Sequence, residues 1–194
     1  GRFGGGIPME EDPVCLTAVT YFAPLRALEA AAGFQPGAWG LAIQRFASME
    51  NVYLAEGARA LVITAPFLAR YSASSAATIF TLAHEMGHAI QRREDPTPWD
   101  PSEPEDAQNR RSRRLEAHAD ALAFGLLARA GYPAGLHEQG LREIFPAAAF
   151  LDERPSATPH PSPRVRLHNA LRLAKGAYPS PRLEDFDEDG RLMN

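Results

Sequence analysis

Apolar residues recur at three- and four-residue spacing along much of the chain, and this spacing predicts helices. A first helix is expected over residues 23–34, where alanine-rich sequence ends at Gly33. A second is expected over residues 36–49, beginning at Pro36. Together with the residues before them, these helices would form an N-terminal segment, residues 1–50, that packs on the core of the protein.

The pattern changes over residues 51–64. Two short runs rich in Val, Tyr, Leu and Ile flank the sequence AEGA, residues 55–58. This arrangement is typical of a β-hairpin, so we expect a small β-sheet in this part of the chain.

Helical spacing returns over residues 72–93, with Ser74 or Ser75 as the residue that caps the helix. One face of this helix carries an apolar stripe made of Ile79, Leu82, Ala83, Met86 and Ile90. Further helices are expected over residues 111–132, 138–145 and 164–177. The chain is therefore expected to be an α+β protein, mainly helical, with its main body over residues 51–176.

Two segments have the composition of irregular structure. Residues 94–109 are rich in proline and acidic residues, which predicts an exposed loop. This loop could be a lid, a cleavage site or simply a solvated connection, and Trp99 within it could contact an apolar substrate. Residues 177–194 form an acidic C-terminal tail that we expect to be loose.

Charge and composition narrow the range of partners. The formal net charge of -4 and the pI of about 5.9 give no reason to expect nucleic acid. A local group of arginines comprises Arg110, Arg111, Arg113 and Arg114. This group could bind an anionic partner, but the simpler interpretation is that it balances the charge of the neighbouring acids. No apolar run approaches the roughly 18 residues of a membrane-spanning helix. A removed N-terminal anchor or export signal stays open, because the chain does not begin with Met.

The chain has one cysteine, Cys15. An internal disulfide and a metal cage made of thiolates are therefore excluded. Cys15 could cap a metal ion as a thiolate in a latent form of the protein, although an ordinary structural cysteine is the default interpretation.

The sequence H-E-M-G-H, residues 84–88, carries the strongest chemical signal. His84 and His88 are one helical turn apart on one face, which suits two corners of a zinc tetrahedron. Glu85 lies beside them, in the position of the general base that takes a proton from zinc-bound water in peptidases of this pattern. The bland alternative is a pair of surface histidines on an ordinary amphipathic helix.

A catalytic zinc needs a third protein ligand. The metzincin pattern fails, because Gln91 and Glu94 stand where it requires Gly and His. Glu116 and Asp120 lie one turn apart beside the apolar stripe of a later helix, whereas His118 points away from them. We therefore expect Glu116 to be the third ligand and Asp120 to accept a hydrogen bond from a zinc-bound histidine. Alternatively, both acids could pair with neighbouring arginines on a solvated face.

These motifs, in this order, resemble the M48 metallopeptidases, the gluzincin family that includes Ste24, HtpX and BepA. The resemblance covers residues 51–175, roughly two thirds of the chain, and includes ALVIT, EAHADALAFGLLARAGYP and TPHPSPRVRL. It implies a zincin-like fold with one zinc ion bound by His84, His88 and Glu116. It also implies that Glu85 is the base and that Asp120 lies behind a ligand.

The same resemblance implies roles for two residues near the C-terminus. His160 would lie near the active site, where it could steady the oxyanion or block the metal in a resting state, and Arg166 would support it or the substrate. Pro159 departs from the family, which usually has Thr before this histidine. The membrane-spanning segments and the TPR array of the family are also missing from this sequence.

The expected activity is that of a zinc-dependent endopeptidase, in which Glu85 activates a zinc-bound water. The polypeptide substrate would bind as an extended strand along an edge strand, for which Ala60–Thr64 is the candidate. The rivals are a zinc-containing module that binds polypeptides without cutting them and a latent peptidase. The family favours the bacterial periplasm or a membrane-associated location, and the cytoplasm stays open.

Overall fold

The computed structural model describes residues 13–55, 59–94, 102–152, 158–176 and 181–193. It is an α+β fold, mainly helical, with one small three-stranded sheet, as the sequence predicts. The helices are α1 (Pro13–Val19), α2 (Phe22–Ala31), α3 (Ala65–Arg70), α4 (Ala76–Glu94), α5 (Glu105–Arg129), α6 (Leu136–Ile144) and α7 (Pro163–Ala174), with 3-10 turns η1 (Ala147–Phe150) and η2 (Leu183–Asp185). The strands are β1 (Gly40–Gln44), β2 (Val52–Ala55) and β3 (Ala60–Thr64).

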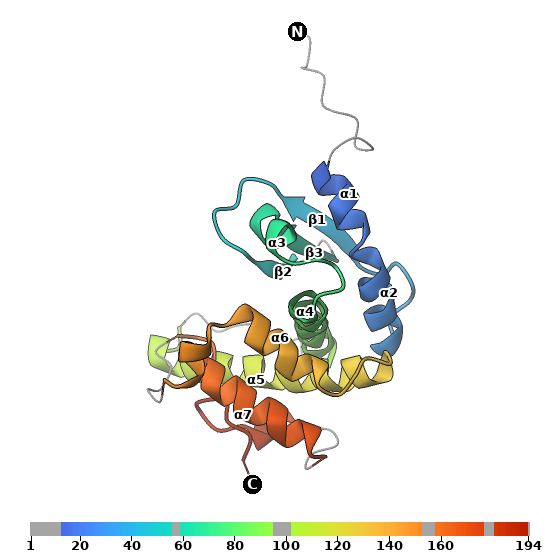
Figure 1. Cartoon of the computed structure of the whole chain (residues 1–194). Helices are drawn as coiled ribbons and strands as arrows, with labels where there is room; N and C mark the ends of the chain where they lie inside the picture. The colour runs from blue at the N-terminus through green and yellow to red at the C-terminus, as the bar shows by residue number, and fades with distance from the viewer. Residues whose placement is uncertain (1–12, 56–58, 95–101, 153–157, 177–180, 194) are drawn as a thin grey trace.

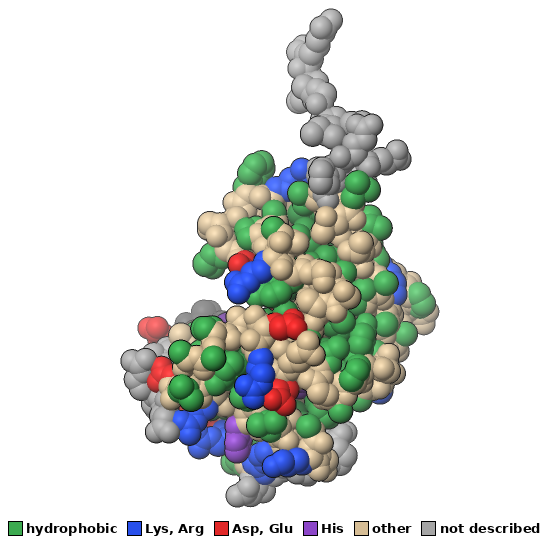
Figure 2. Space-filling model, in the orientation of Figure 1, with side chains coloured by type: hydrophobic (Ala, Val, Ile, Leu, Met, Phe, Trp, Pro, Cys, Tyr) green, Lys and Arg blue, Asp and Glu red, His purple; other side chains and the backbone are tan. Residues whose placement is uncertain are grey.

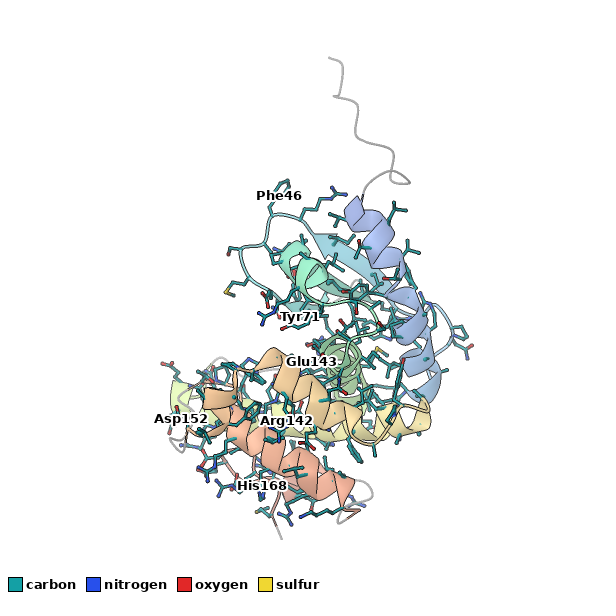
Figure 3. The ribbon with its side chains drawn as sticks, viewed as in Figure 1. Phe46, Tyr71, Arg142, Glu143, Asp152 and His168 are labelled. Carbon is teal, nitrogen blue, oxygen red and sulfur yellow. The ribbon has the colours of Figure 1, made fainter. Side chains whose placement is uncertain are left out.

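Helix α4 lies at the centre of the fold. It contacts α2 and strand β2 on one side and helices α5 and α6 on the other (Figure 1). Most of its side chains are buried, including every member of the predicted stripe. Ser75 caps it as expected, because its hydroxyl accepts a hydrogen bond of 3.1 Å from Thr78 N. Glu143 of α6, labelled in Figure 3, accepts a further bond of 2.8 Å from Ala77 N.

Two glycines allow the helices around α4 to approach it closely. A Cβ atom on Gly87 would lie 2.7 Å from the carbonyl oxygen of Ala119 in α5. A Cβ atom on Gly140 would lie 2.5 Å from the Cβ atom of Phe80. Because neither position has room for a side chain, these glycines determine how closely α5 and α6 pack on the central helix.

The sheet has the strand order β1-β3-β2. Strands β2 and β3 are antiparallel, which confirms the predicted hairpin, and β1 pairs with β3 in parallel. Strand β3, residues 60–64, is therefore the central strand, and the expectation that it offers an edge to substrate is wrong. The free edge next to α4 belongs to β2.

The prediction of a helix over residues 36–49 is also wrong, because this segment contains β1. Buried Glu29 accepts hydrogen bonds from the backbone N–H groups of Gly37, at 3.1 Å, and Trp39, at 2.7 Å, which fold the chain into a turn. Gly37 has a φ of 79°, outside the helical region. Beyond the turn, Leu41 and Ile43 alternate with exposed residues, which is a strand period that the alanine-rich composition obscured.

Helix α5 begins earlier than expected, so the predicted loop is wrong over residues 105–109. Pro104 precedes the helix. The negative charges of Glu105 and Asp106 in its first turn stabilise the helix, because they lie at the positive end of the helix dipole. Residues 95–101, with Trp99, lie outside the described residues. The roles suggested for that loop therefore stay predictions.

The described residues of the C-terminal tail, 181–193, are packed rather than loose. Phe186 and Leu192 are each 1% exposed and lie against α5 and α7. Two apolar side chains among acidic residues are enough to anchor the segment. Arg113 is buried at the same junction, and Arg110 pairs with Asp106, so these two arginines have partners within the chain.

The surface carries mixed charges on the face seen in Figure 2, where Lys and Arg side chains lie beside Asp and Glu. Phe46, at the outer edge of the connection between β1 and β2, is fully exposed (Figure 3). Among the described residues, no helix combines the length and hydrophobicity needed to cross a bilayer.

Candidate metal centre

Three side chains from two helices converge at one point beside α4. His84 and His88 come from α4, and Glu116 comes from α5. The distances between their facing atoms are 3.2 Å for His84 Nε2 to His88 Nε2, 3.1 Å for His84 Nε2 to Glu116 Oε2 and 3.3 Å for His88 Nε2 to Glu116 Oε1. His84 is buried and the other two are partly buried. This His-His-Glu group could hold a metal ion.

The contact between Gly87 and Ala119 explains why these ligands meet. Gly87 lies between the two histidines in the sequence, and Ala119 lies one helical turn after Glu116. Because the helix backbones touch at this point, Glu116 is held within reach of both imidazoles. The spacing in the sequence predicts that the two histidines share a face of one helix, and Gly87 lets the helix that carries Glu116 approach them.

The outer nitrogens of both histidines are hydrogen-bonded, which determines the tautomers. His84 Nδ1 donates to Asp120 Oδ1 at 2.8 Å, because an ionised carboxylate only accepts. Gln91 Nε2 donates to the carbonyl of Leu115 at 2.8 Å, so its Oε1 is free to accept from His88 Nδ1 at 2.9 Å. With a metal bound, both Nε2 atoms would therefore present their lone pairs to the ion, as metal ligands do.

Asp120 lies where the sequence predicts it, and it has a second partner. Arg166 of α7 donates to both of its oxygens, from Nε at 2.7 Å and from a terminal nitrogen at 2.6 Å. The guanidinium lies between the rings of Phe80 and Phe145, 5.6 Å from each centroid. Arg166 thus contacts the acid behind His84, and it also lines the cleft described below. The roles that the resemblance implies for it, supporting His160 or the substrate, stay predictions.

The charges of the site favour a cation between the three ligands. Burial lowers the pKa of His84, but hydrogen bonds to Asp120 and Glu116 outweigh it and raise the pKa to about 10. Burial opposes ionisation of Glu116 and Asp120, yet the imidazoles around Glu116 and the Arg166 guanidinium beside Asp120 hold both pKa values below their usual range. A divalent cation can supply, in place of the proton on His84, the positive charge that these buried acids require. The residues present therefore fit a metal ion.

Glu85 lies next to the ligands but does not belong to the ligand group. Its side chain is buried, and its Oε2 atom accepts a hydrogen bond of 3.1 Å from the backbone N–H of Leu54 in β2. Burial raises the pKa of this carboxyl group, against the opposing effect of the two histidines. A buried acid with an elevated pKa beside a metal position is suited to receiving and returning a proton.

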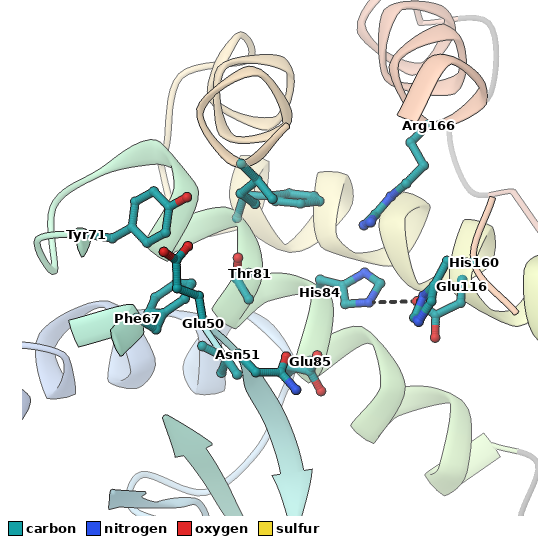
Figure 4. A pocket seen from close by; sticks show the side chains of 13 residues that line it. Glu50, Asn51, Phe67, Tyr71, Thr81, His84, Glu85, Glu116, His160 and Arg166 are labelled. Atoms are coloured by element: carbon teal, nitrogen blue, oxygen red, sulfur yellow. Dashed lines mark ion pairs between the residues drawn. The ribbon is translucent and has the colours of Figure 1, made fainter. Parts of the chain in front are cut away.

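His160 contacts the same Glu116 oxygen as His84 does. Its Nδ1 atom is 3.1 Å from Glu116 Oε2, and its side chain is 59% exposed (Figure 4). Among the described residues, the group that could hold a metal comprises only His84, His88 and Glu116. His160 therefore contacts a ligand and lies outside the ligand set.

A cleft of about 210 Å³ opens beside these residues. Its lining includes His84, Glu85, Glu116 and His160 (Figure 4). Apolar and aromatic side chains also line it, including Phe67, Tyr71, Phe80 and Ile144, together with the polar residues Glu50 and Asn51. The candidate metal position thus faces a space that a ligand can enter.

The other two histidines near the site are not ligands. His118 Nδ1 lies 3.1 Å from Gln91 Nε2, and burial lowers its pKa. His137 of α6 is buried against the ring of Phe80, and burial lowers its pKa to about 4. The prediction that His118 points away from the ligands agrees with these contacts. Cys15 lies in α1, but its side chain is outside the described residues.

Sequence reasoning missed two contacts that complete the site. Gln91 was considered only as a departure from the metzincin pattern, although its spacing of three residues from His88 could have indicated a hydrogen bond within the helix. The bond from Leu54 to Glu85 joins residues 31 positions apart in the chain, and no local pattern predicts it.

Comparisons with protein family models, curated proteins and solved structures found no match.

Proposed function

We propose that the protein is a zinc-dependent endopeptidase of the gluzincin type, related to the M48 metallopeptidases. The observation that carries the proposal is the convergence of His84 Nε2, His88 Nε2 and a Glu116 carboxylate beside the buried Glu85, at the wall of an open cleft. A purely structural zinc site has four protein ligands and no use for an adjacent base, whereas a catalytic site keeps one position open.

Zinc is the metal that this donor set suits best. Two imidazole nitrogens and one carboxylate are a common set in zinc peptidases. Ligand atoms about 2.0–2.1 Å from a tetrahedral zinc ion lie about 3.3–3.4 Å from one another. The separations of 3.1, 3.2 and 3.3 Å between the facing atoms are close to this spacing.

The side chains of the site have complementary parts in peptide hydrolysis. A bound zinc ion would polarise the scissile carbonyl group and make water a stronger acid. Glu85 takes the proton of the attacking water and later passes it to the leaving amine. Asp120 holds His84 in the tautomer that binds the metal, and Arg166 keeps Asp120 ionised. His160, at the edge of the cleft, stabilises the oxyanion.

The contacts of His160 bear on whether the enzyme is latent. A resting state blocked by His160 would need one of its nitrogens in the fourth ligand position. Instead its Nδ1 atom is directed to the carboxylate of Glu116, and the ring lies outside the ligand group. An active enzyme is therefore the better proposal.

The substrate in this proposal is an extended polypeptide. Strand β2 has a free edge beside α4, and Val52 at its start lines the cleft. A substrate strand added to this edge would be held by backbone hydrogen bonds, with little demand on its sequence. Strand β2 thus takes the role that the sequence suggested for residues 60–64.

Metal analysis combined with a cleavage assay tests the proposal. Elemental analysis of the purified protein after mild dialysis should find one zinc ion per chain, and the zinc-loaded protein should cleave casein. Zinc without cleavage would support the rival function, a module that binds polypeptides without cutting them. A folded protein that neither contains zinc nor takes it up would overturn both.

A further inference from the structure

The backbone that carries His160 is held by an arginine from α5. Arg113 is 7% exposed, and a terminal nitrogen of its guanidinium donates to the carbonyl of Thr158 at 3.2 Å. Thr158 in turn forms two side-chain hydrogen bonds with the backbone of His160, at 3.2 and 3.3 Å. Two residues further along, Ser162 caps helix α7. The position of His160 therefore depends on this short segment, residues 158–162.

The same arginine also holds the C-terminal segment, residues 181–193. Its Nε atom donates to the carbonyl of Glu188 at 3.0 Å. Asn169 of α7, which is buried, donates to the carbonyl of Gly190 at 2.7 Å and accepts from Leu192 N at 2.9 Å. One guanidinium thus joins the backbone near His160 to a C-terminal segment that is itself fastened to α7.

Gly190 of the C-terminal segment leaves no room for a side chain between itself and Pro161. Its φ is 75°, and a Cβ atom at this position would lie 2.8 Å from the ring of Pro161 and 2.7 Å from the carbonyl oxygen of Arg113. Pro161 is buried and directly follows His160 in the chain. Any side chain at position 190 must therefore displace Pro161, Arg113 or the C-terminal segment itself.

We propose that residues 181–193 position His160 over the metal centre, with Gly190 and Arg113 as the positioning residues. This inference rests on the proposed function, because it assigns His160 a part in the reaction. The imidazole of His160 is exposed, and its contact in the site is with Glu116. Because little packing surrounds the ring, its position depends on the backbone of residues 158–162. The acidic tail, which lies outside the ligand helices, becomes a functional part of the active site.

Gly190→Ala tests the proposal, and Gly176→Ala is its matched control. Gly176 has a φ of 71°, nearly the same as Gly190, but a Cβ atom there would meet nothing within 4 Å. Both variants place an alanine at a positive φ and so carry similar backbone strain, but only the Cβ atom of Gly190→Ala would clash with Pro161. A misplacement of about 1 Å at a reacting group can cost about 100-fold in rate. We expect kcat to fall at least about 10-fold in Gly190→Ala, with KM and zinc content unchanged, and to stay unchanged in Gly176→Ala.

The same pair of variants in a His160→Ala background separates positioning from general damage. If the C-terminal segment acts through His160, Gly190→Ala has no further effect on kcat once the imidazole is gone. An equal fall of kcat in both backgrounds would overturn the proposal, as would an unchanged kcat in Gly190→Ala. If His160→Ala alone leaves kcat unchanged, the proposal is wrong while the zinc and Glu85 mechanism stands.

A measurement that needs no activity keeps the two proposals distinguishable. The imidazole NMR signal of His160, assigned from its loss in His160→Ala, should shift in Gly190→Ala and stay in place in Gly176→Ala. This holds whether or not the wild type cleaves casein, and an unmoved signal would overturn the positioning. Should Gly190→Ala fail to fold, Arg113→Lys replaces it, because an ammonium group cannot hold the Thr158 and Glu188 carbonyls as the guanidinium fork does.

Discussion

The carboxylate of Glu85 accepts a hydrogen bond from the backbone N–H of Leu54, at 3.1 Å. This bond joins the central helix to strand β2, so the acid beside the metal ligands is held by the sheet as well as by its own helix. Since that N–H group points to α4, it lies on the edge of β2 that is not paired with β3. The proposed function assigns the substrate to the same strand edge that holds the base.

Removing the carboxylate ligand should remove the metal. Glu116→Ala leaves two imidazoles, so we expect zinc affinity to fall at least about 100-fold in a competition with a chromogenic chelator. His118→Ala is the matched control, because it removes from the same helix a partly buried side chain that contacts none of the three ligands, and Gln91 keeps its bond to the Leu115 carbonyl. Its zinc affinity should equal that of the wild type. An equal loss of zinc affinity in Glu116→Ala and His118→Ala would contradict the assignment of Glu116 as a zinc ligand.

Asp120→Asn should weaken the zinc site and destabilise the fold. The amide can still accept from His84, but it no longer compensates the buried Arg166. We expect zinc affinity to fall about 10–100-fold, and the free energy of unfolding to fall by about 3–5 kcal/mol, as measured in urea. Adding Arg166→Met should recover part of the stability but not the zinc affinity. A double variant as unstable as the single one would contradict the ion-pair account.

Zinc binding should release protons. The pKa of His84 is raised from 6.5 to about 10 in the metal-free fold, so the stabilisation from its charged form is complete below pH 6.5 and lost as the pH rises through about 10. Between these values zinc must displace the proton on His84. Calorimetry at pH 7.5 in two buffers of different ionisation enthalpy should find about one proton released per zinc ion. Binding with no proton release would show that His84 is already neutral.

The helix contact at Gly87 should be sensitive to a single methyl group. Gly87→Ala would place a Cβ atom 2.7 Å from Ala119 O, so we expect a loss of about 1–3 kcal/mol in stability. It should also weaken zinc binding, because α5 carries Glu116. Gly125→Ala is the control within a helix, since its Cβ atom would meet only the flexible end of Arg129, at 3.3 Å. That variant should be unchanged or up to about 1 kcal/mol more stable in urea denaturation. Equal effects of the two substitutions would argue against the close contact.

Much of the candidate site is predictable from the sequence because helical spacing converts directly into geometry. His84 and His88, and likewise Glu116 and Asp120, are four residues apart, so each pair shares a helix face whatever the rest of the fold does. The bond from Leu54 to Glu85 and the position of Arg166 on Asp120 depend on how distant elements pack. No local pattern contains that information.

The errors in the fold have similar causes. Residues 36–49 look helical by composition, but the turn around Glu29 and the pairing of β1 with β3 override local propensity. The tail looks loose because it is acidic, yet Phe186 and Leu192 bury enough apolar surface to anchor it. The strand at residues 60–64 is predicted correctly, but its central place in the sheet depends on β1, a segment whose composition predicts a helix.

The rate of casein cleavage by zinc-loaded Glu85→Gln, beside zinc-loaded wild type, tests the central claim most directly. Glutamine keeps an oxygen that can accept from Leu54 N, so the fold and the zinc content should be unchanged, but it cannot take the proton of the attacking water. The account predicts cleavage by the wild type and a loss of at least about 100-fold in Glu85→Gln. Cleavage at the wild-type rate by a fully zinc-loaded Glu85→Gln protein would contradict it.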